Sequence, residues 1–373
     1  MKRSFALLLV TLLAIGAFVF AGCAPESSQP ADEGSTPAPT DDEEETPTPA
    51  APEGEVIKWQ YQGHPPVSDY YFKSVERIAE HITTMSGGRL VVEPYAGGSI
   101  VPASEELDGV HQGILNMGSA CPMYAVGKFP QAALFDAVSG GMTALQMTLW
   151  HTKGNGDALA AKMWEDKMNV KFVGTAGQLP PEVWCQTNKM IETPDDLDGL
   201  KMRCAGDGGE ILASMGVSTV YFPGGEVYES MQRGVIDAFE YASPFLNWGM
   251  GFHEVADYLY MSPSRAPTDN AHVWVNGDDW AALSPDLQQI VIDACAAVGI
   301  EYTAESYMKD DEALVEYLNY GTEVMTMPAA VEEAYLQAAM EFYDAKAAAD
   351  PFYKEIVDDH WAFKAICDRA GIK

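Results

Sequence analysis

The sequence has few basic residues for its length. Lys and Arg number 22 against 55 Asp and Glu in 373 residues, which gives a formal net charge of −33. Binding to duplex nucleic acid requires a basic surface, so this composition argues against a nucleic-acid partner. It argues equally against docking on an anionic headgroup surface. An anionic ligand would need a local positive site that works against the field of the whole chain.

The common motifs of catalysis and metal ligation are also missing. The seven His residues are scattered and none belongs to an HExxH pair, and no GxSxG elbow or Walker loop occurs. A catalytic triad is not excluded, because its members can be far apart in the sequence. Nothing in the sequence argues for an enzyme.

The one long apolar run lies at the N-terminus. Two basic residues precede an apolar segment over residues 5–20, which ends at Ala21-Gly22-Cys23. This pattern predicts a secretory signal peptide over residues 1–22. The small residues before Cys23 resemble a bacterial lipobox, in which the Cys becomes the first mature residue and carries acyl chains. A membrane-spanning helix is the alternative, but the lipobox favours an exported protein that is lipid-anchored to a bacterial membrane, in the periplasm or at the cell surface.

A polar, proline-rich segment follows over residues 23–55. From residue 24 on it carries ten acidic and no basic residues, which leaves 45 acidic against 20 basic residues in 56–373. Such a composition cannot bury enough apolar surface to order itself, and its charges keep it extended. We therefore expect a disordered spacer between the anchor and a soluble domain. A specific binding role for the acidic run at 41–45 is the alternative.

Cysteine is sparse, and with Cys23 assigned to the lipid five remain. Export permits disulfides, but five is an odd number and no spacing resembles a metal knuckle. Cys185 and Cys204 fall in two predicted strands on either side of a short helix, so a bond between them stays open. Otherwise these cysteines are expected to be small buried side chains.

Strands and helices alternate through the rest of the chain, which predicts an α/β fold. At about 150 residues per domain, the length suggests two lobes joined by a hinge. We expect a first lobe at 56–170, completed by a segment that returns at 271–310, and a second lobe at 171–270. Helices fill 311–373. Two hinge-linked lobes in an exported protein resemble a periplasmic-binding-protein fold, in which ligand binds in the cleft.

A strand predicted over residues 200–204 ends in a candidate anion site. Its alternation places Arg203 on the face opposite Met202 and Cys204, beside a glycine-rich helix start. The guanidinium matches a carboxylate bidentately, and the helix N-terminus adds partial positive charge. Pairing of Arg203 with a structural Asp, such as Asp196 or Asp198, is the alternative.

An ordered series of motifs includes this strand. It runs through Gly-Leu-Lys-Met-Arg at 199–203, Met-Gly-Val at 215–217, Pro-Gly-Gly-Glu-Val-Tyr at 223–228 and Gly-Val-Ile-Asp-Ala-Phe-Glu at 234–240. Residues 118–130 and the opening Lys58-Trp59-Gln60 match as well. The series resembles the substrate-binding subunit of tripartite ATP-independent periplasmic (TRAP) transporters over roughly residues 56–310. It is closest to the branch that binds 2-oxo or 2-hydroxy monocarboxylates together with a cation.

The resemblance implies roles for individual residues. Arg203 would clamp the substrate carboxylate. Glu240, the backbone carbonyl of Tyr241 and the amide of Gln178 would hold a Ca²⁺ or Na⁺ ion that bridges the substrate. The loop expected at 174–178 is shorter than is usual in the family, and the branch has Trp where Tyr241 stands.

Two further residues would face the cleft. They are Tyr124 and His64, and His64 replaces a more typical Trp; ordinary packing is the alternative for both. Glu240 follows an apolar run, and a buried carboxylate there needs either a cation or a base such as Arg203 as its partner.

Two features outside the motif series complete the prediction. Arg265 could contact an anion, but a solvated loop charge is the favoured interpretation. A stripe at Tyr335, Leu336, Ala339, Met340 and Tyr343 is expected to be core, although long terminal helices mediate dimers in the resembled branch, so a homodimer stays open.

The sequence therefore predicts an extracytoplasmic solute receptor and no enzymatic activity. It would capture a small organic acid, close around it and deliver it to the membrane permease subunits of a TRAP transporter, which an ion gradient drives. A solute-binding protein of another transporter class, or a sensor partner, is the alternative.

Overall fold

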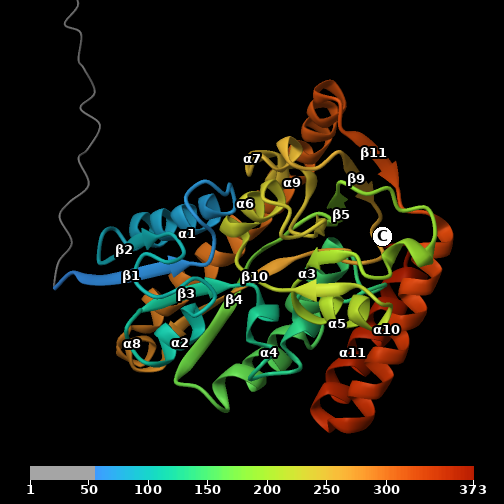
Figure 1. Ribbon diagram of the computed structural model, residues 1–373. Coiled ribbons are helices and arrows are strands. Elements are labelled where there is room, and N and C mark those ends of the chain that lie inside the picture. The colour runs from blue at the N-terminus through green and yellow to red at the C-terminus, as the bar shows by residue number, and fades with distance from the viewer. Residues whose placement is uncertain (1–54) are drawn as a thin grey trace, which may run out of the picture. The chain divides into compact units, whose positions relative to one another are not determined.

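The computed structural model describes residues 55–373, so the predicted signal peptide, Cys23 and nearly all of the acidic spacer lie outside the described residues. Within 55–373, strands form a five-stranded sheet in the order β2-β1-β3-β10-β4 and a six-stranded sheet in the order β11-β9-β5-β8-β6-β7. Helices cover both sheets (Figure 1). This confirms the predicted α/β class with two units.

The strands are β1 (Ile57–Gly63), β2 (Leu90–Tyr95), β3 (Met117–Ala120), β4 (Val170–Gln178), β5 (Val183–Thr187), β6 (Lys201–Arg203), β7 (Ser218–Val220), β8 (Ala238–Phe239), β9 (Tyr258–Met261), β10 (Asn270–Asn276) and β11 (Glu323–Thr326).

The α-helices are α1 (Phe72–Met85), α2 (Glu106–His111), α3 (Ala144–Lys153), α4 (Gly156–Glu165), α5 (Gly206–Ser214), α6 (Val227–Gln232), α7 (Pro244–Gly249), α8 (Gly277–Ala282), α9 (Pro285–Tyr320), α10 (Ala329–Ala349) and α11 (Pro351–Arg369). Short 3-10 turns are η1 (Pro122–Ala125), η2 (Ala132–Phe135), η3 (Pro194–Leu197), η4 (Gly224–Glu226) and η5 (Phe252–Glu254).

The first sheet contains the returning strand that the sequence predicted. β1 pairs in parallel with β2 and β3, whereas β10 inserts antiparallel between β3 and β4. Every residue of β10 is buried, as expected for a central strand covered on both faces. The apolar residues Ala271, Val273, Trp274 and Val275 thus place a segment from late in the chain inside the first sheet, between β3 and β4.

The second sheet departs from the predicted strand pattern in two places. The apolar motif at 234–240 forms a strand, β8, at two residues only, and Val235 is 58% exposed before it. β11 pairs in parallel with β9 at the sheet edge, within a stretch predicted to be helical. The alternation predicted for 200–204 is confirmed, because Met202 and Cys204 lie in the core.

The chain crosses between the sheets three times within residues 55–373, and one crossing is the segment 277–322, mostly helix α9, which leads from β10 to β11. Residues 179–182 connect β4 to β5, and residues 262–269 connect β9 to β10. β4 belongs to the first sheet, so that sheet continues past residue 170, where the first lobe was expected to end. The lobe boundaries themselves remain a prediction.

Helix α9 packs against both units. Over 36 residues, about 54 Å of helix, it contacts β4 and α1 on one side and α7 and β11 on the other. The helix comes close to β4 where Gly299 faces Gly177, since a Cβ on Gly177 would lie 2.8 Å from the Gly299 carbonyl oxygen. Gly177 also has φ +115°, which other residues rarely adopt.

Helices α10 and α11 lie side by side at the C-terminus (Figure 1). Three members of the predicted α10 stripe, Tyr335, Ala339 and Tyr343, are buried in the main core, whereas Met340 is 43% exposed. The Tyr343 hydroxyl accepts from the Ser139 amide at 2.9 Å. None of the helices in residues 55–373 has the length and apolarity needed to cross a membrane.

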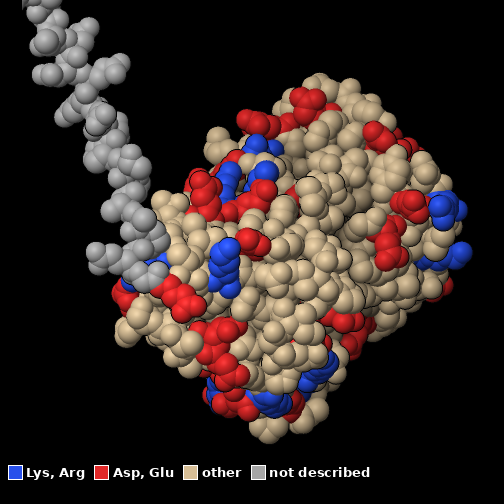
Figure 2. All heavy atoms as spheres, turned by 90° about the vertical axis from the view of Figure 1, so that its left-hand side faces the viewer, with Lys and Arg blue, Asp and Glu red and all other residues tan. Residues whose placement is uncertain are grey.

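Charge is dispersed over the surface that Figure 2 shows. Acidic groups lie at the margins of a broad uncharged area, often with a basic side chain beside them. Among the ion pairs of the described residues, Arg77 and Glu305 lie 2.7 Å apart. This face carries no extended basic patch of the kind that duplex nucleic acid requires.

Candidate functional site

The predicted site residues gather at one edge of each sheet. In the first sheet the carboxyl ends of β1, β3 and β4 lie on the same side as the start of antiparallel β10. In the second sheet the carboxyl ends of β6 and β8 lie on the same side as the start of β5. The crossings at 179–182 and 262–269 run between these ends of the strands. Ligands of α/β sheets bind outside such carboxyl ends. The residues there are His64, Tyr124, Gln178, Arg203, Glu240 and Tyr241.

Arg203 and Glu240 form a buried ion pair. They are 1% and 2% exposed, and Arg203 Nη1 donates to Glu240 Oε1 at 3.0 Å and to its backbone oxygen at 2.8 Å. Arg203 Nε donates to the Phe222 carbonyl at 3.1 Å. Of the two alternatives left open, Glu240 pairs with Arg203, whereas Asp196 instead accepts from the Thr193 amide in the cap of η3.

The prediction that Arg265 is a solvated loop charge was wrong. Arg265 is 5% exposed, and its Nη1 lies 3.2 Å from Glu240 Oε2. Its Nη2 donates to the Glu182 carboxylate and, at 3.0 Å, to the Val183 carbonyl. The reason is topological, because the crossing that carries Arg265 runs between the sheets beside the crossing that carries Glu182.

Arg203, Glu240, Arg265 and Glu182 thus form a chain of alternating charges, which we call the central ion-pair cluster. Two guanidinium groups balance two carboxylates, and burial of charges is tolerated only when they are paired in this way. Neither arginine was expected to share a partner. In the sequence, the only indication of this cluster was the presence of charged residues near the ends of strands.

The cluster leaves Glu240 poorly suited to hold a cation. Its Oε1 accepts from Arg203 and, at 2.7 Å, from the Ala205 amide, while Oε2 faces Arg265. A metal ion at this carboxylate would compete with two fixed positive charges. The residues present around Glu240 therefore do not fit a cation site in this arrangement.

Gln178 lies in strand β4, so the prediction of a loop at 174–178 was wrong. Its side chain is buried, and Oε1 accepts from Asn270 Nδ2 at 3.3 Å and from Thr268 Oγ1 at 3.5 Å. Its Nε2 has no partner within residues 55–373. Gln178 thus contacts residues near the start of β10, and no hydrogen bond joins it to Glu240 in the described chain.

Aromatic rings enclose the guanidinium of Arg203. Its Cζ lies 5.4 Å from the ring centre of Tyr221 and 5.7 Å from that of Tyr241. Tyr124 packs 5.8 Å from Tyr221, and His64 packs 5.4 Å from Tyr124. We call Tyr124, Tyr221, Tyr241 and His64 the aromatic cage. Cationic groups are attracted to ring faces, so the cage holds Arg203 in place.

The cage is neutral. Burial lowers the pKa of His64 to about 3, so its imidazole is uncharged at ordinary pH. Burial raises the pKa of Tyr124 and Tyr241 well above the usual value, so both keep their hydroxyl protons. Arg203 Nη2 makes no hydrogen bond to any described residue. Its N–H groups are therefore available for an anion inside a neutral, aromatic surround.

Two hydrogen bonds join the loops of the two sheets across the cage. Tyr241 donates from its hydroxyl to Asp69 Oδ2, and Tyr221 shares a hydrogen bond of 3.1 Å with Ser104. Burial raises the pKa of Asp69. The sequence analysis missed Asp69 and Tyr221, although Tyr221 directly follows β7 and Asp69 lies in the loop after β1.

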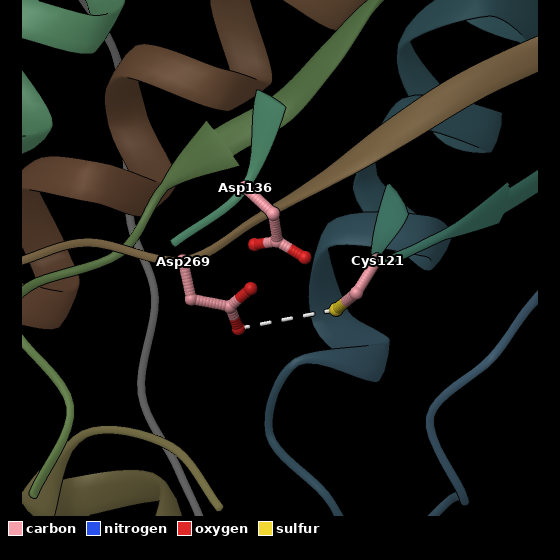
Figure 3. Close-up of side chains that lie close together, drawn as sticks. All are labelled: Cys121, Asp136 and Asp269. Atoms are coloured by element: carbon pink, nitrogen blue, oxygen red, sulfur yellow. Dashed lines mark hydrogen bonds between the residues drawn. The ribbon is translucent and has the colours of Figure 1, made fainter. Parts of the chain in front are cut away.

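Beside the cage, a pocket of about 340 Å³ is lined by Met123, Tyr124, Gly206, Gly209 and Tyr221, among others. It reaches the first turn of α5, the helix that was predicted to add positive charge near Arg203. The Cys185 and Cys204 thiols are both free and buried, so the open question of a disulfide is answered against it. One group of potential metal ligands converges within residues 55–373, and it consists of Cys121, Asp136 and Asp269 (Figure 3).

Comparison with known proteins shows the family. The profile of bacterial extracellular solute-binding protein family 7 matches residues 63–350, and the chain belongs to that family. A monocarboxylate 2-oxoacid-binding periplasmic protein from Nostoc sp. (strain PCC 7120) is 28% identical over 308 residues, which are 83% of this chain and 84% of that protein. The predicted TRAP-type solute receptor is thereby confirmed, and the family is extracytoplasmic.

Solved structures agree with this assignment. A TRAP solute-binding protein from Colwellia psychrerythraea, with calcium and pyruvate bound, superposes with a TM-score of 0.80 at 28% identity, covering 85% of this chain and 99% of that one. One from Bordetella bronchiseptica, a dimer with calcium and picolinate, has a TM-score of 0.81 at 25% identity, covering 85% and 94%. Relatives of this fold therefore hold small carboxylates together with a cation.

Proposed function

We propose that this receptor binds a short 2-oxo or 2-hydroxy monocarboxylate, such as pyruvate, in the aromatic cage. One observation carries the proposal: Arg203 Nη2 is left without a partner among the described residues, while Nε and Nη1 are fixed by the protein. An anchored guanidinium with free N–H groups is prepared to donate to a carboxylate.

The cage also supports the choice of a short acid. The protonated tyrosine hydroxyls can donate to a 2-oxo or 2-hydroxy oxygen, and the rings exclude water from the carboxylate. The neutral His64 adds no charge that would attract a second carboxylate. The central ion-pair cluster is already neutral, so it has no spare positive charge to offset a second carboxylate of the ligand. This favours a monoacid over a diacid.

The mechanism we propose is closure without covalent change. The bonds from Tyr241 to Asp69 and between Tyr221 and Ser104 join loops of the two sheets. An acid that contacts both sides would stabilise the closed form and shift the open–closed equilibrium. The closed receptor would then deliver the acid unchanged to the permease subunits of a TRAP transporter. Transfer to another transporter class, or to a sensor, is the competing function.

A cation belongs to the proposal, because relatives hold calcium with their acids. The sequence assigned it to Glu240, Gln178 and the Tyr241 carbonyl. The contacts of Glu240 with Arg203 and Arg265 argue against that placement. If Ca²⁺ or Na⁺ binds, its ligands are to be sought elsewhere in the cleft.

We also propose the lipid anchor and a homodimer as properties of the whole protein. Acylation at Cys23 predicts membrane-associated protein that becomes soluble in a Cys23→Ser variant. For the dimer, α9 exposes Ile300, Met308 and Leu318 at 68%, 70% and 61%. A relative with this fold is a dimer, so we propose that a second copy of the chain packs on this exposed part of α9. Light scattering should show the dimer, and Met308→Glu should yield monomers.

The acid site is tested by calorimetric titration of pyruvate into the purified protein with calcium present. Arg203→Lys should weaken binding at least 100-fold, because Lys keeps the charge but loses the planar fork. Arg233→Lys is the matched control, since Arg233 is exposed and its one ion pair within residues 55–373 is with Glu229, four positions earlier. Unchanged affinity in Arg203→Lys would remove Arg203 from the site. Tyr124→Phe provides a second test if Arg203→Lys does not fold.

A further inference from the structure

The turn before helix α2 holds an unusual backbone conformation. Ser104 has φ +74°, and within residues 55–373 it is the one residue other than glycine with a positive φ. Residues with a Cβ rarely adopt this conformation, because the side chain comes too close to the backbone. Such a residue persists only where the surrounding structure fixes it, and strained positions of this kind cluster at functional sites.

Two buried side chains fix the backbone on both sides of Ser104. Gln62 of β1 is fully buried, and its Oε1 accepts from the amides of Ile100 at 2.8 Å and Val101 at 3.2 Å. Its Nε2 donates to the Val101 carbonyl and to Glu106 Oε1, both at 2.9 Å. Glu106 begins α2 and is fully buried as well. The turn is thus held at both ends, which explains how it keeps a strained residue.

Ser104 contacts the second unit at Tyr221. Its Oγ lies 3.1 Å from the Tyr221 hydroxyl, and the ring centre of Tyr221 lies 5.4 Å from Arg203 Cζ. Arg203 is 1% exposed, whereas Tyr221 is 44% exposed and is the most exposed member of the aromatic cage. The Tyr221 ring therefore covers the buried guanidinium on the side that faces solvent.

The pocket beside the cage adjoins the same ring. Its lining includes Tyr221 and Tyr124 of the cage, Gly209 of α5, and Cys204, which directly follows Arg203 in the chain. Its volume of about 340 Å³ lies within the range of small-ligand sites. An acid in this pocket would thus lie next to the cover of Arg203.

We propose that Ser104 and Tyr221 form a latch over the acid site, and that the pocket beside α5 is the route by which the acid reaches and leaves Arg203. Rotation of the Tyr221 side chain away from Ser104 opens the path from the pocket to the guanidinium. Return of the ring to Ser104 closes the path behind the acid. This assignment rests on the proposed function only in taking Arg203 as the partner of the carboxylate.

The two halves of the latch differ in the way that a gate requires. Ser104 is the fixed half, because its turn is anchored at both ends. Tyr221 is the movable half, because its ring is partly exposed and its hydroxyl bonds to the first unit through Ser104. The other contact across the cage, from Tyr241 to Asp69, has an acceptor that is 3% exposed, and neither residue lines the pocket.

The test measures the rates of pyruvate binding and release by stopped-flow fluorescence on the purified full-length protein with calcium present. Tyr221→Phe and Ser104→Ala each remove the hydroxyl bond and should speed release about fivefold, which corresponds to one exposed hydrogen bond. The double variant should release pyruvate no faster than either single variant, since all three lose the same bond. Tyr228→Phe is the matched control, because it loses an exposed bond to Glu254 away from the pocket.

A second measurement tests the fixed half of the latch. Ser104→Gly also removes the hydroxyl, but glycine adopts the positive φ without strain. It should therefore release pyruvate as fast as Ser104→Ala and yet melt at a higher temperature than Ser104→Ala. Equal melting temperatures would refute the strained turn as the fixed half of the latch.

Two results would overturn the latch itself. They are release rates within twofold of the wild type in both single variants, or additive effects in the double variant. Arg203→Lys separates the latch from the proposed function. Binding that is lost in Arg203→Lys, with release rates that do not respond to Ser104 or Tyr221, would keep the acid site and refute the latch. Wild-type protein that does not bind pyruvate, or unchanged affinity in Arg203→Lys, would refute the acid site and the latch together.

Discussion

Removal of the Arg265 charge should destabilise the protein strongly. In Arg265→Met the chain would keep its apolar stem but leave Glu182, which is 1% exposed, without a basic partner, and would leave Arg203 as the one base beside Glu240. Breaking a buried ion pair on one side costs about 3–5 kcal/mol, because the remaining charge stays desolvated. We therefore expect a loss of about 4 kcal/mol in the free energy of unfolding.

Urea unfolding at pH 8 measures this loss. Arg233→Met is the control, and since Arg233 forms an exposed ion pair on its own helix we expect a change of at most about 0.5 kcal/mol. Arg265→Met/Glu182→Gln should recover much of the stability, because it removes the orphaned carboxylate. Burial raises the pKa of Glu182 and the Arg265 charge lowers it, so in the single variant this pKa rises further, and the loss relative to the wild type should be larger at pH 8 than at low pH, where Glu182 is protonated. A loss under about 1 kcal/mol, or no recovery in the double variant, would refute the argument that the charges compensate one another.

Three further predictions concern a buried acid, the contact between the two sides of the cleft and a close backbone approach. Burial raises the pKa of Glu106 from 4.5 to about 7, so the folded protein holds this proton more tightly than the unfolded chain, and its contribution to stability falls by about 3 kcal/mol as pH rises from about 4.5 to 7. Glu106→Gln should therefore stabilise the protein in urea at pH 8 and change it little at pH 4.5; equal effects at both pH values would contradict this. Tyr241→Phe removes the hydroxyl bond to Asp69 and should weaken acid binding about tenfold, or 1.4 kcal/mol, in calorimetry, whereas Tyr228→Phe, which loses an exposed bond to Glu254, should not. Gly97→Ala would place a Cβ 2.1 Å from the His64 carbonyl oxygen and should lower stability by about 1–3 kcal/mol in thermal melting; a wild-type melting temperature would show that the loop shifts freely.

Part of the site could be predicted because its signals are local. Arg203 ends an alternating strand and precedes a glycine-rich helix start, and both features are written in consecutive residues. Glu240 and Tyr241 likewise follow a short strand directly. Strand ends in an α/β fold point at the cleft, so a reading of the elements alone brings Arg203 and Glu240 to the same edge. The returning strand at 270–276 follows from the same logic, since its residues Ala271, Val273, Trp274 and Val275 need a covered position.

The partners of these residues could not be predicted. Arg265 and Glu182 are 83 positions apart, and Asp269 and Cys121 are 148 apart. Whether Arg265 is solvated or buried depends on the path of one crossing past another, which no local pattern encodes. For the same reason Glu240 could equally have received a cation or a base, and only the packed structure shows that two arginines reach it.

The sequence by itself determined the α/β alternation, the family and the strand end that carries Arg203, because propensity, periodicity and motif order are properties of neighbouring residues. The tertiary structure alone decided which charges neutralise one another. The crossings that carry Glu182 and Arg265 bring them into the space beside Arg203 and Glu240, while the start of β10 brings Asp269 to Asp136. Burial in a common interior makes each unpaired charge costly, so arginines offset the carboxylates of Glu240 and Glu182, whereas at Asp136 and Asp269 burial raises the pKa of both carboxyl groups.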